Sequence, residues 1–201
     1  MSRARTVTGM PSNPPILLLD TNVWLDLFLP HRPGGTAAAE LIEAAEAASA
    51  SLAYPSHALL DVYQKVRSDN KRWIRQSRPL TEMDALAIKR MAWDFVDIMR
   101  RIATAIPCDR NDVDLACAFR DGHDDLEDDL VLAACQRAHA NYLVTTDARL
   151  ASHAPLEAKS PQGMTELLRS GRARSTSTTR DAASDTEWLY EWLSTWGNQD
   201  S

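Results

Sequence analysis

The sequence predicts an α/β protein with three layers, α/β/α, around a central, mostly parallel sheet, followed by a C-terminal helical tail. Two short apolar runs carry this prediction: residues 15–20 read PILLLD and residues 142–146 read YLVTT. Both are too short for a helix and are typical of buried strands in a parallel sheet. Segments with helical spacing of apolar residues separate them, and this alternation favours a parallel sheet between two helical layers.

The other elements follow in chain order. Residues 1–14 are polar and contain prolines, so we predict a flexible leader before a domain at 15–170. The further helices are predicted at 23–29, 36–49, from 56 or 57 onward, 81–104, 110–120 and in the segment that begins with the acids 124–129. The further strands are predicted at 51–54, 105–107 and 156–159, with a turn or short helix at 148–153 and a last helix at 160–168.

The end of the chain differs in composition from the domain. Residues 171–183 are rich in Ser and Thr and are predicted to form a linker. Residues 184–201 are predicted to contain a helix on which Trp188, Trp192 and Trp196 recur every four residues, on one face. Such a face either docks onto the domain or contacts a second copy of the chain or a protein partner.

Composition limits the classes of function. With 44% hydrophobic residues, a chain of 201 residues can bury one good core, and its net charge of −6 argues against a purely electrostatic nucleic-acid binder. The three cysteines have no metal-ligand spacing and are expected to be small buried hydrophobes in a reducing compartment. Without a signal-peptide core or a bilayer-spanning run, we expect a cytoplasmic protein with no membrane partner.

Acidic residues gather at three places in the predicted fold. Five of the six residues 124–129 are acidic, and a helix N-terminus favours negative charge by only about 0.3–1 kcal/mol per group, so the excess needs water or a cation. Asp128 shares a helical face with apolar residues and is predicted to point inward, whereas Asp124, Glu127 and Asp129 can be left to solvent. Asp20 and Asp147 follow strands, at the sheet edge where ligands bind, and Asp61 lies just after another. The alternative is a solvated, acid-rich helix start.

Basic residues concentrate in the segment 65–79, which reads KVRSDNKRWIRQSRP. Basic side chains around an aromatic residue, here Trp73, suit a phosphate backbone and an unstacked base. A solvated helix face is the alternative interpretation. The candidates for nucleic-acid contact are Arg67, Lys71, Arg72 and Arg75.

Three stretches of the chain resemble one known family. They are ILLLDTNVWLD near the start, DLEDDLVLAACQRAHANYLVTTD, and SPQGMTELL after it. In this order they are similar to the PIN domain, the nuclease fold that includes VapC-type toxins of toxin–antitoxin systems, and the resemblance covers residues 15–168. It implies a metal-dependent ribonuclease with an RNA substrate and an antitoxin protein as partner. A homodimer is the expectation if the tryptophan face contacts a second copy of the chain.

The resemblance also implies roles for individual residues. Asp20, Asp128 and Asp147 match acids that bind metal and catalyse, with Asp125 as an additional metal ligand in some members. Asp61 is the fourth catalytic candidate, although the family usually has Glu there, and Asp129 is the alternative to Asp128 if the register differs by one. The groups expected to orient these carboxylates are Thr21, Asn22 and Thr145.

Carboxylates without a His or Cys cluster favour Mg²⁺ or Mn²⁺ over zinc. Such ions activate water and offset charge on a phosphodiester. The residues by themselves imply only a phosphate ester, and the resemblance implies RNA. Two alternatives remain open: a haloacid dehalogenase-type phosphatase, which requires a second Asp where this chain has Asn22, and a non-catalytic PIN-like module that binds RNA or protein.

Overall fold

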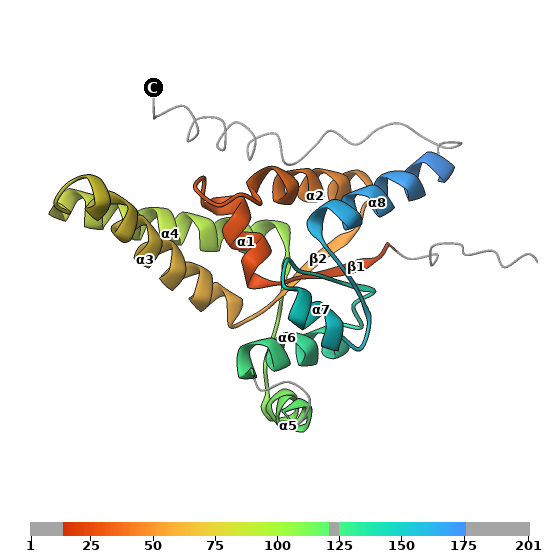
Figure 1. Ribbon diagram of the computed structural model, residues 1–201. Coiled ribbons are helices and arrows are strands. Elements are labelled where there is room, and N and C mark those ends of the chain that lie inside the picture. The colour runs from red at the N-terminus through yellow and green to blue at the C-terminus, as the bar shows by residue number, and fades with distance from the viewer. Residues whose placement is uncertain (1–13, 121–124, 176–201) are drawn as a thin grey trace, which may run out of the picture.

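The computed structural model describes residues 14–120 and 125–175 (Figure 1). All but the last residue of the predicted leader, most of the predicted linker and the tryptophan-rich segment 184–201 lie outside this part of the chain. No helix among the described residues is long and apolar enough to cross a membrane.

A five-stranded sheet with order β3-β2-β1-β4-β5 forms the centre of the domain, and every neighbouring pair of strands is parallel. The strands are β1 (Ile16–Leu19), β2 (Ser51–Pro55), β3 (Thr104–Ile106), β4 (Tyr142–Val144) and β5 (Glu157–Lys159). β1 lies in the middle, where Leu18 is in register with Ala53 of β2 and with Leu143 of β4. Its continuous apolar run is what a strand covered on both faces requires.

Helices cover both faces of this sheet (Figure 1). The helices on one face are α1 (Thr21–Phe28), α2 (Gly35–Ala47), α3 (Ala58–Ser77), α4 (Glu82–Ile102) and α8 (Pro161–Ser175), and those on the other are α5 (Arg110–Phe119), α6 (Leu126–Arg137) and α7 (Ala148–His153). Side chains of β1 alternate between the two cores. Leu17 and Leu19 belong to the first, and Leu18 packs with α6, β4 and α7 in the second. The predicted three-layer α/β/α fold is therefore confirmed.

Helices α3 and α4 form a long hairpin that projects from the domain (Figure 1). α4 begins with a capping box, in which Thr81 and Asp84 each accept a hydrogen bond from the other's backbone N–H. Arg78, from the connection, donates two hydrogen bonds to Asp84, at 2.6 and 2.7 Å. These contacts fix the turn between the two helices.

Two local expectations differ from the structure. α8 continues to Ser175, past the predicted end at residue 168, because the Ala and Arg residues beyond Gly171 are good helix formers. The expectation of three buried cysteines is wrong for two of them: Cys135 is buried, but Cys108 and Cys117 are exposed. Cys108 lies in the connection after β3, and Cys117 lies on the outer side of α5, so a position within a structured segment did not imply burial.

Candidate acidic active site

The candidate site lies where the order of the strands reverses. The chain runs from β1 through β2 to β3 at one edge and then returns to place β4 on the other side of β1. In an open α/β sheet, ligands bind at the carboxyl ends of the strands beside such a reversal. Here the backbone N–H of Asp20 donates to Val144 O at 3.0 Å, and the Thr145 hydroxyl donates to Asp20 Oδ2 at 2.9 Å. The ends of β1 and β4 thus converge, as predicted.

Asp20 is a buried carboxylate, with 4% of its surface exposed. Asn22 Nδ2 also donates to its Oδ2, at 3.4 Å. Burial raises the pKa of Asp20, hydrogen bonds from Thr145, the Thr21 backbone and Asn22 lower it in part, and the charge of Glu127 raises it further. This position therefore disfavours a lone negative charge and favours a proton or a cation.

Asn22 connects Asp20 to a partly buried ion pair. Arg32 Nη2 donates to Asn22 Oδ1 at 3.3 Å, and the same guanidinium pairs with the buried Asp26. Asp26 in turn packs on Gly34, at the start of α2, where an added Cβ would overlap its carboxylate. The chain of contacts from Asp20 to Gly34 holds Asn22 in place.

We expect Gly34→Ala to destabilise the domain by about 1–3 kcal/mol, because a methyl group there overlaps the buried carboxylate of Asp26. The φ angle of Gly34 is −83°, which alanine adopts readily, so the cost is steric. Gly163→Ala is the matched control, because its Cβ would meet Ser160 Oγ at an ordinary 3.4 Å. Urea unfolding measures both variants, and equal midpoints for the two would contradict the expectation.

Thr145 orients two acidic residues with one hydroxyl. Its Oγ1 donates to Asp20 and accepts the backbone N–H of Asp147 at 2.9 Å. Asp147 is half-buried and caps α7, with Oδ1 accepting from the N–H groups of Arg149 and Leu150. One side chain thus fixes the spacing between two of the predicted site residues.

The acids at the start of α6 are placed one residue away from the predicted register. Asp129 is buried, with 2% exposed, whereas Asp128 is only half-buried. The expectations that Asp128 is the buried acid and that Asp129 is left to solvent are therefore wrong. α6 is buried on almost every side from residue 131 to 135, so apolar spacing did not identify one inner face. Asp125 is the N-cap, and its Oδ1 accepts from the backbone N–H groups of Glu127 and Asp128.

Asp61 lies in the first turn of α3. Burial raises its pKa, and the charge of Glu127 raises it further, while His57 and Lys65 lower it. Glu127 comes from α6, and its Oε1 lies 3.6 Å from Lys65 Nζ. The starts of α3 and α6 therefore face each other across the end of the sheet.

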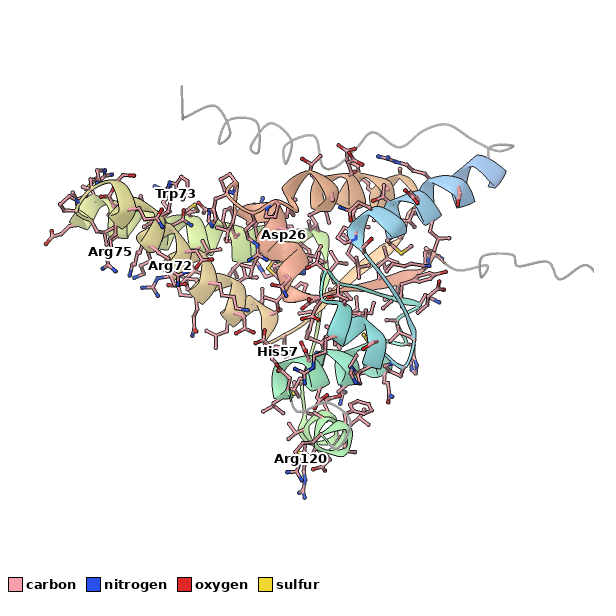
Figure 2. All side chains as sticks on the ribbon, viewed as in Figure 1. Asp26, His57, Arg72, Trp73, Arg75 and Arg120 are labelled. Carbon is pink, nitrogen blue, oxygen red and sulfur yellow. The ribbon has the colours of Figure 1, made fainter. Side chains whose placement is uncertain are left out.

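Two site residues were missed by the sequence prediction. Glu127 is exposed, as predicted. It is nevertheless close enough for its charge to raise the pKa of Asp20, Asp61 and His57. His57 is the N-cap residue of α3 and lies near the start of α6 (Figure 2). Its position two residues after β2 was the only available signal, because strand ends on this edge of the sheet form the crevice.

The described residues contain no group of three or more His, Cys, Asp or Glu side chains arranged to hold a metal ion. The available donors are nevertheless mostly carboxylate oxygens, which are the ligands that Mg²⁺ and Mn²⁺ prefer. Three buried polar atoms at the site, Thr21 Oγ1 and both ring nitrogens of His57, have no hydrogen-bond partner among the described residues. The donor chemistry thus fits a hard cation.

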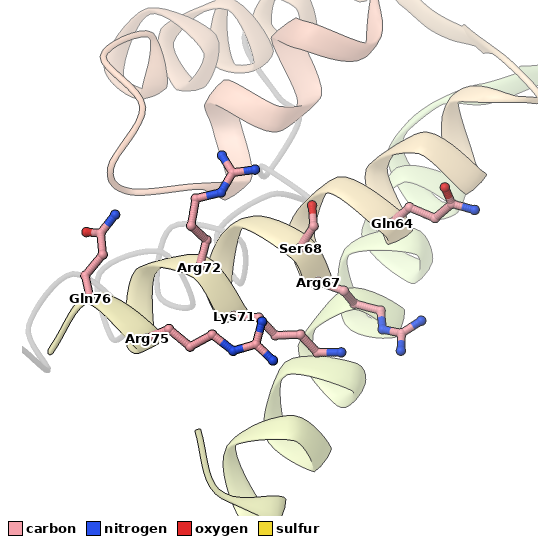
Figure 3. Close-up of a pocket in the computed structure, with 7 residues that line it drawn as sticks. All are labelled: Gln64, Arg67, Ser68, Lys71, Arg72, Arg75 and Gln76. Carbon is pink, nitrogen blue, oxygen red and sulfur yellow. The ribbon is translucent and has the colours of Figure 1, made fainter. Parts of the chain in front are cut away.

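The predicted nucleic-acid contacts divide between two sides of α3. Arg67, Lys71 and Arg75 project from one side, and we call them the basic stripe, whereas Arg72 projects from the other side (Figure 3). Arg72 also lies 3.9 Å from Asp69. Together with polar neighbours, these four residues line one open pocket. The stripe begins six residues beyond Asp61 on the same helix, about 9 Å along its axis.

Fold and site together define an α/β protein with acidic residues gathered at the reversal point of a parallel sheet. The chain belongs to the PIN domain family, whose members are nucleases, because the sequence model of the PIN domain matches residues 17–149. This match confirms the resemblance inferred from the sequence, and it spans all the acids discussed above.

A solved structure has a similar fold. It is the crystal structure of VapBC2 from Rickettsia felis bound to a DNA fragment from their promoter. The similarity has a TM-score of 0.50 and 18% sequence identity, and it covers 72% of this chain and 98% of that one. No curated protein sequence matches the chain.

Proposed function

We propose that this PIN domain is a metal-dependent ribonuclease that hydrolyses RNA phosphodiester bonds at the end of β1 and β4. The observation that carries the proposal is Asp20, a buried carboxylate at the reversal point of the sheet, whose Oδ2 accepts hydrogen bonds from Thr145 and Asn22. Keeping a carboxylate in such a place costs stability unless positive charge meets it. A divalent cation supplies that charge.

We assign roles by position. Asp20, Asp147 and Asp129 would hold Mg²⁺ or Mn²⁺, with Asp129 in place of Asp128 because Asp129 is the buried acid. A bound ion supplies a water of lowered pKa and charge that stabilises the phosphate in the transition state. Thr145 and Asn22 orient Asp20, and the Asp125 cap fixes the first turn of α6. Bringing like-charged acids to one ion also relieves their mutual repulsion.

Glu127 is proposed to compensate for the short Asp61. The family usually has Glu at the position of Asp61, and Asp lacks one methylene of reach. Glu127 lies on α6, close enough to Asp61 and Asp20 for its charge to raise the pKa of both. The two acids together would then supply the carboxylate that a single Glu supplies in relatives.

The basic stripe is proposed to bind the RNA backbone beside the acidic site. The chain as a whole carries a charge of −6, so substrate must be attracted locally. Arg67, Lys71 and Arg75 offer that local charge, whereas Arg78 is neutralised by Asp84. Trp73 is 54% exposed and stacks on His31, with ring centroids 5.6 Å apart, so it offers an exposed aromatic surface on the same helix.

Family membership and the fold shared with VapBC2 support a toxin of a toxin–antitoxin system as the biological role. An antitoxin protein is then the proposed partner, and a homodimer remains a prediction. The haloacid dehalogenase alternative is disfavoured, because Asn22 stands where a second Asp is required.

A non-catalytic PIN-like binding module is the second candidate. It is favoured by one observation: no metal-binding group of three side chains is preformed in the described part of the chain. Calorimetric titration with Mn²⁺ separates the candidates. The nuclease is expected to bind Mn²⁺ and to cleave mixed single-stranded RNAs in Mn²⁺ but not in EDTA. RNA binding without Mn²⁺ binding or cleavage would select the binding module instead.

A further inference from the structure

His57 lies beside the acids of the candidate site, at the start of α3. It lies between β2 and α3, and its backbone carbonyl accepts hydrogen bonds from the N–H groups of Leu60 and Asp61, at 2.9 and 3.2 Å. The residue therefore starts the helix that carries Asp61. These bonds fix its backbone, whereas the ring can still turn about its two side-chain torsions.

His57 is half-buried as a residue, but both of its ring nitrogens are buried. Neither Nδ1 nor Nε2 contacts water-accessible space, and neither has a hydrogen-bond partner among the residues that the structure describes. Buried polar atoms in native proteins are almost always hydrogen-bonded, and leaving two nitrogens unpaired costs stability. A residue that costs stability at a functional site is often retained for a ligand.

The charges around His57 indicate the chemistry of that ligand. Burial lowers the pKa of His57, whereas the carboxylates of Asp61, Glu127 and Asp20 raise it. Lys65, the nearby cation, is paired with Glu127. A phosphate entering this place meets three acids, so it needs a donor. A neutral imidazole keeps one N–H, and His57 can therefore donate in either protonation state.

We propose that His57 contacts the substrate in this site, with a ring N–H donating a hydrogen bond to a non-bridging oxygen of the RNA phosphate. The proposal rests on the ribonuclease function proposed above. His57 then satisfies one of its buried nitrogens only when RNA is bound. It also offsets part of the repulsion between the phosphate and the surrounding acids.

The test compares His57→Phe, which keeps a ring but removes both nitrogens, with His57→Asn and His57→Gln, whose amides place an N–H near Nδ1 and Nε2. Fluorescence anisotropy of a labelled single-stranded RNA in EDTA measures affinity without cleavage. Phe is expected to weaken binding about tenfold, the effect of a hydrogen bond to a charged group. One of the two amide variants is expected to restore affinity to within about threefold. The exposed His153→Phe is the control and should bind as the wild type does.

Melting temperatures distinguish contact from a structural role. His57→Phe is expected to keep or raise the melting temperature, because it removes two unpaired nitrogens. Unchanged RNA affinity, or joint loss of affinity and stability without rescue by either amide, overturns the proposal for His57 alone. If the wild type neither binds nor cleaves RNA, the ribonuclease proposal fails and this inference fails with it. If His57→Phe does not fold, His57→Ala takes its place with the same expected loss.

Discussion

Asp20→Asn is expected to lower Mn²⁺-dependent RNA cleavage by at least about 100-fold while the protein becomes more stable at neutral pH. Groups that only support a metal ligand cost about 10–100-fold when removed, and Asp20 is proposed to be a ligand itself. Asparagine keeps the shape of the side chain, so the contact with Thr145 can persist. Cleavage assays and melting curves of the same preparations measure both effects.

The stability gain has a defined pH dependence. Burial raises the pKa of Asp20 above its ordinary value of 3.8, so the folded state holds this proton more tightly than the unfolded state. Ionised Asp20 therefore lowers the free energy of unfolding at pH 7. This penalty decreases as the pH falls toward 3.8, below which Asp20 is protonated in both the folded and the unfolded state. The advantage of asparagine should shrink over the same range.

Asp94→Asn is the matched control for this experiment, because Asp94 is exposed on α4. It is expected to change neither cleavage nor the melting temperature. Full activity of Asp20→Asn, with the control also active, would contradict the proposed catalytic site. A melting temperature lowered by Asp20→Asn would contradict the account of its burial.

Replacing both Lys71 and Arg75 by glutamine is expected to weaken RNA binding and to flatten its salt dependence. For single-stranded nucleic acid, each phosphate contact contributes roughly 0.7 to the slope of log affinity against log salt, so losing two contacts reduces the slope by about 1.4. Both residues belong to the basic stripe. Anisotropy titrations at several salt concentrations give the slope directly.

Arg72→Gln supplies the matched control on the same helix. Arg72 projects away from the stripe and lies beside Asp69, so its loss is expected to change affinity and slope less than either stripe residue does. If Arg72→Gln and Arg75→Gln weakened RNA binding equally, binding would depend only on the overall charge of α3 and not on the stripe. Unchanged binding by the double variant would remove the stripe from the proposed function.

The strands and the central acids could be predicted because their signals are local. β1 and β4 are short apolar runs that end in or near aspartate, and parallel strands bring their carboxyl ends to one edge. The order of the strands could not be read from the sequence. It depends on which helices pack together, and that is decided by contacts between residues far apart in the chain.

The register of α6 and the roles of His57 and Glu127 could not be predicted for the same reason. Asp128 and Asp129 are adjacent, and a helix that is buried nearly all round gives no apolar stripe by which to choose between them. His57 and Glu127 lie seventy positions apart in the sequence, and only the packing of α3 against the sheet end makes their charges interact. Both residues are typical of helix starts when seen alone.

Helix α3 carries Asp61 in its first turn and Arg75 in its last. Arg75 lies fourteen positions after Asp61 in an unbroken helix, a rise of about 21 Å along its axis. Because a helix does not stretch, one rigid segment sets the distance between the proposed RNA-binding stripe and the proposed cleavage site. In a nuclease built this way, the length of RNA bound on one side of the cleaved bond depends on the length of the helix and not on the base sequence.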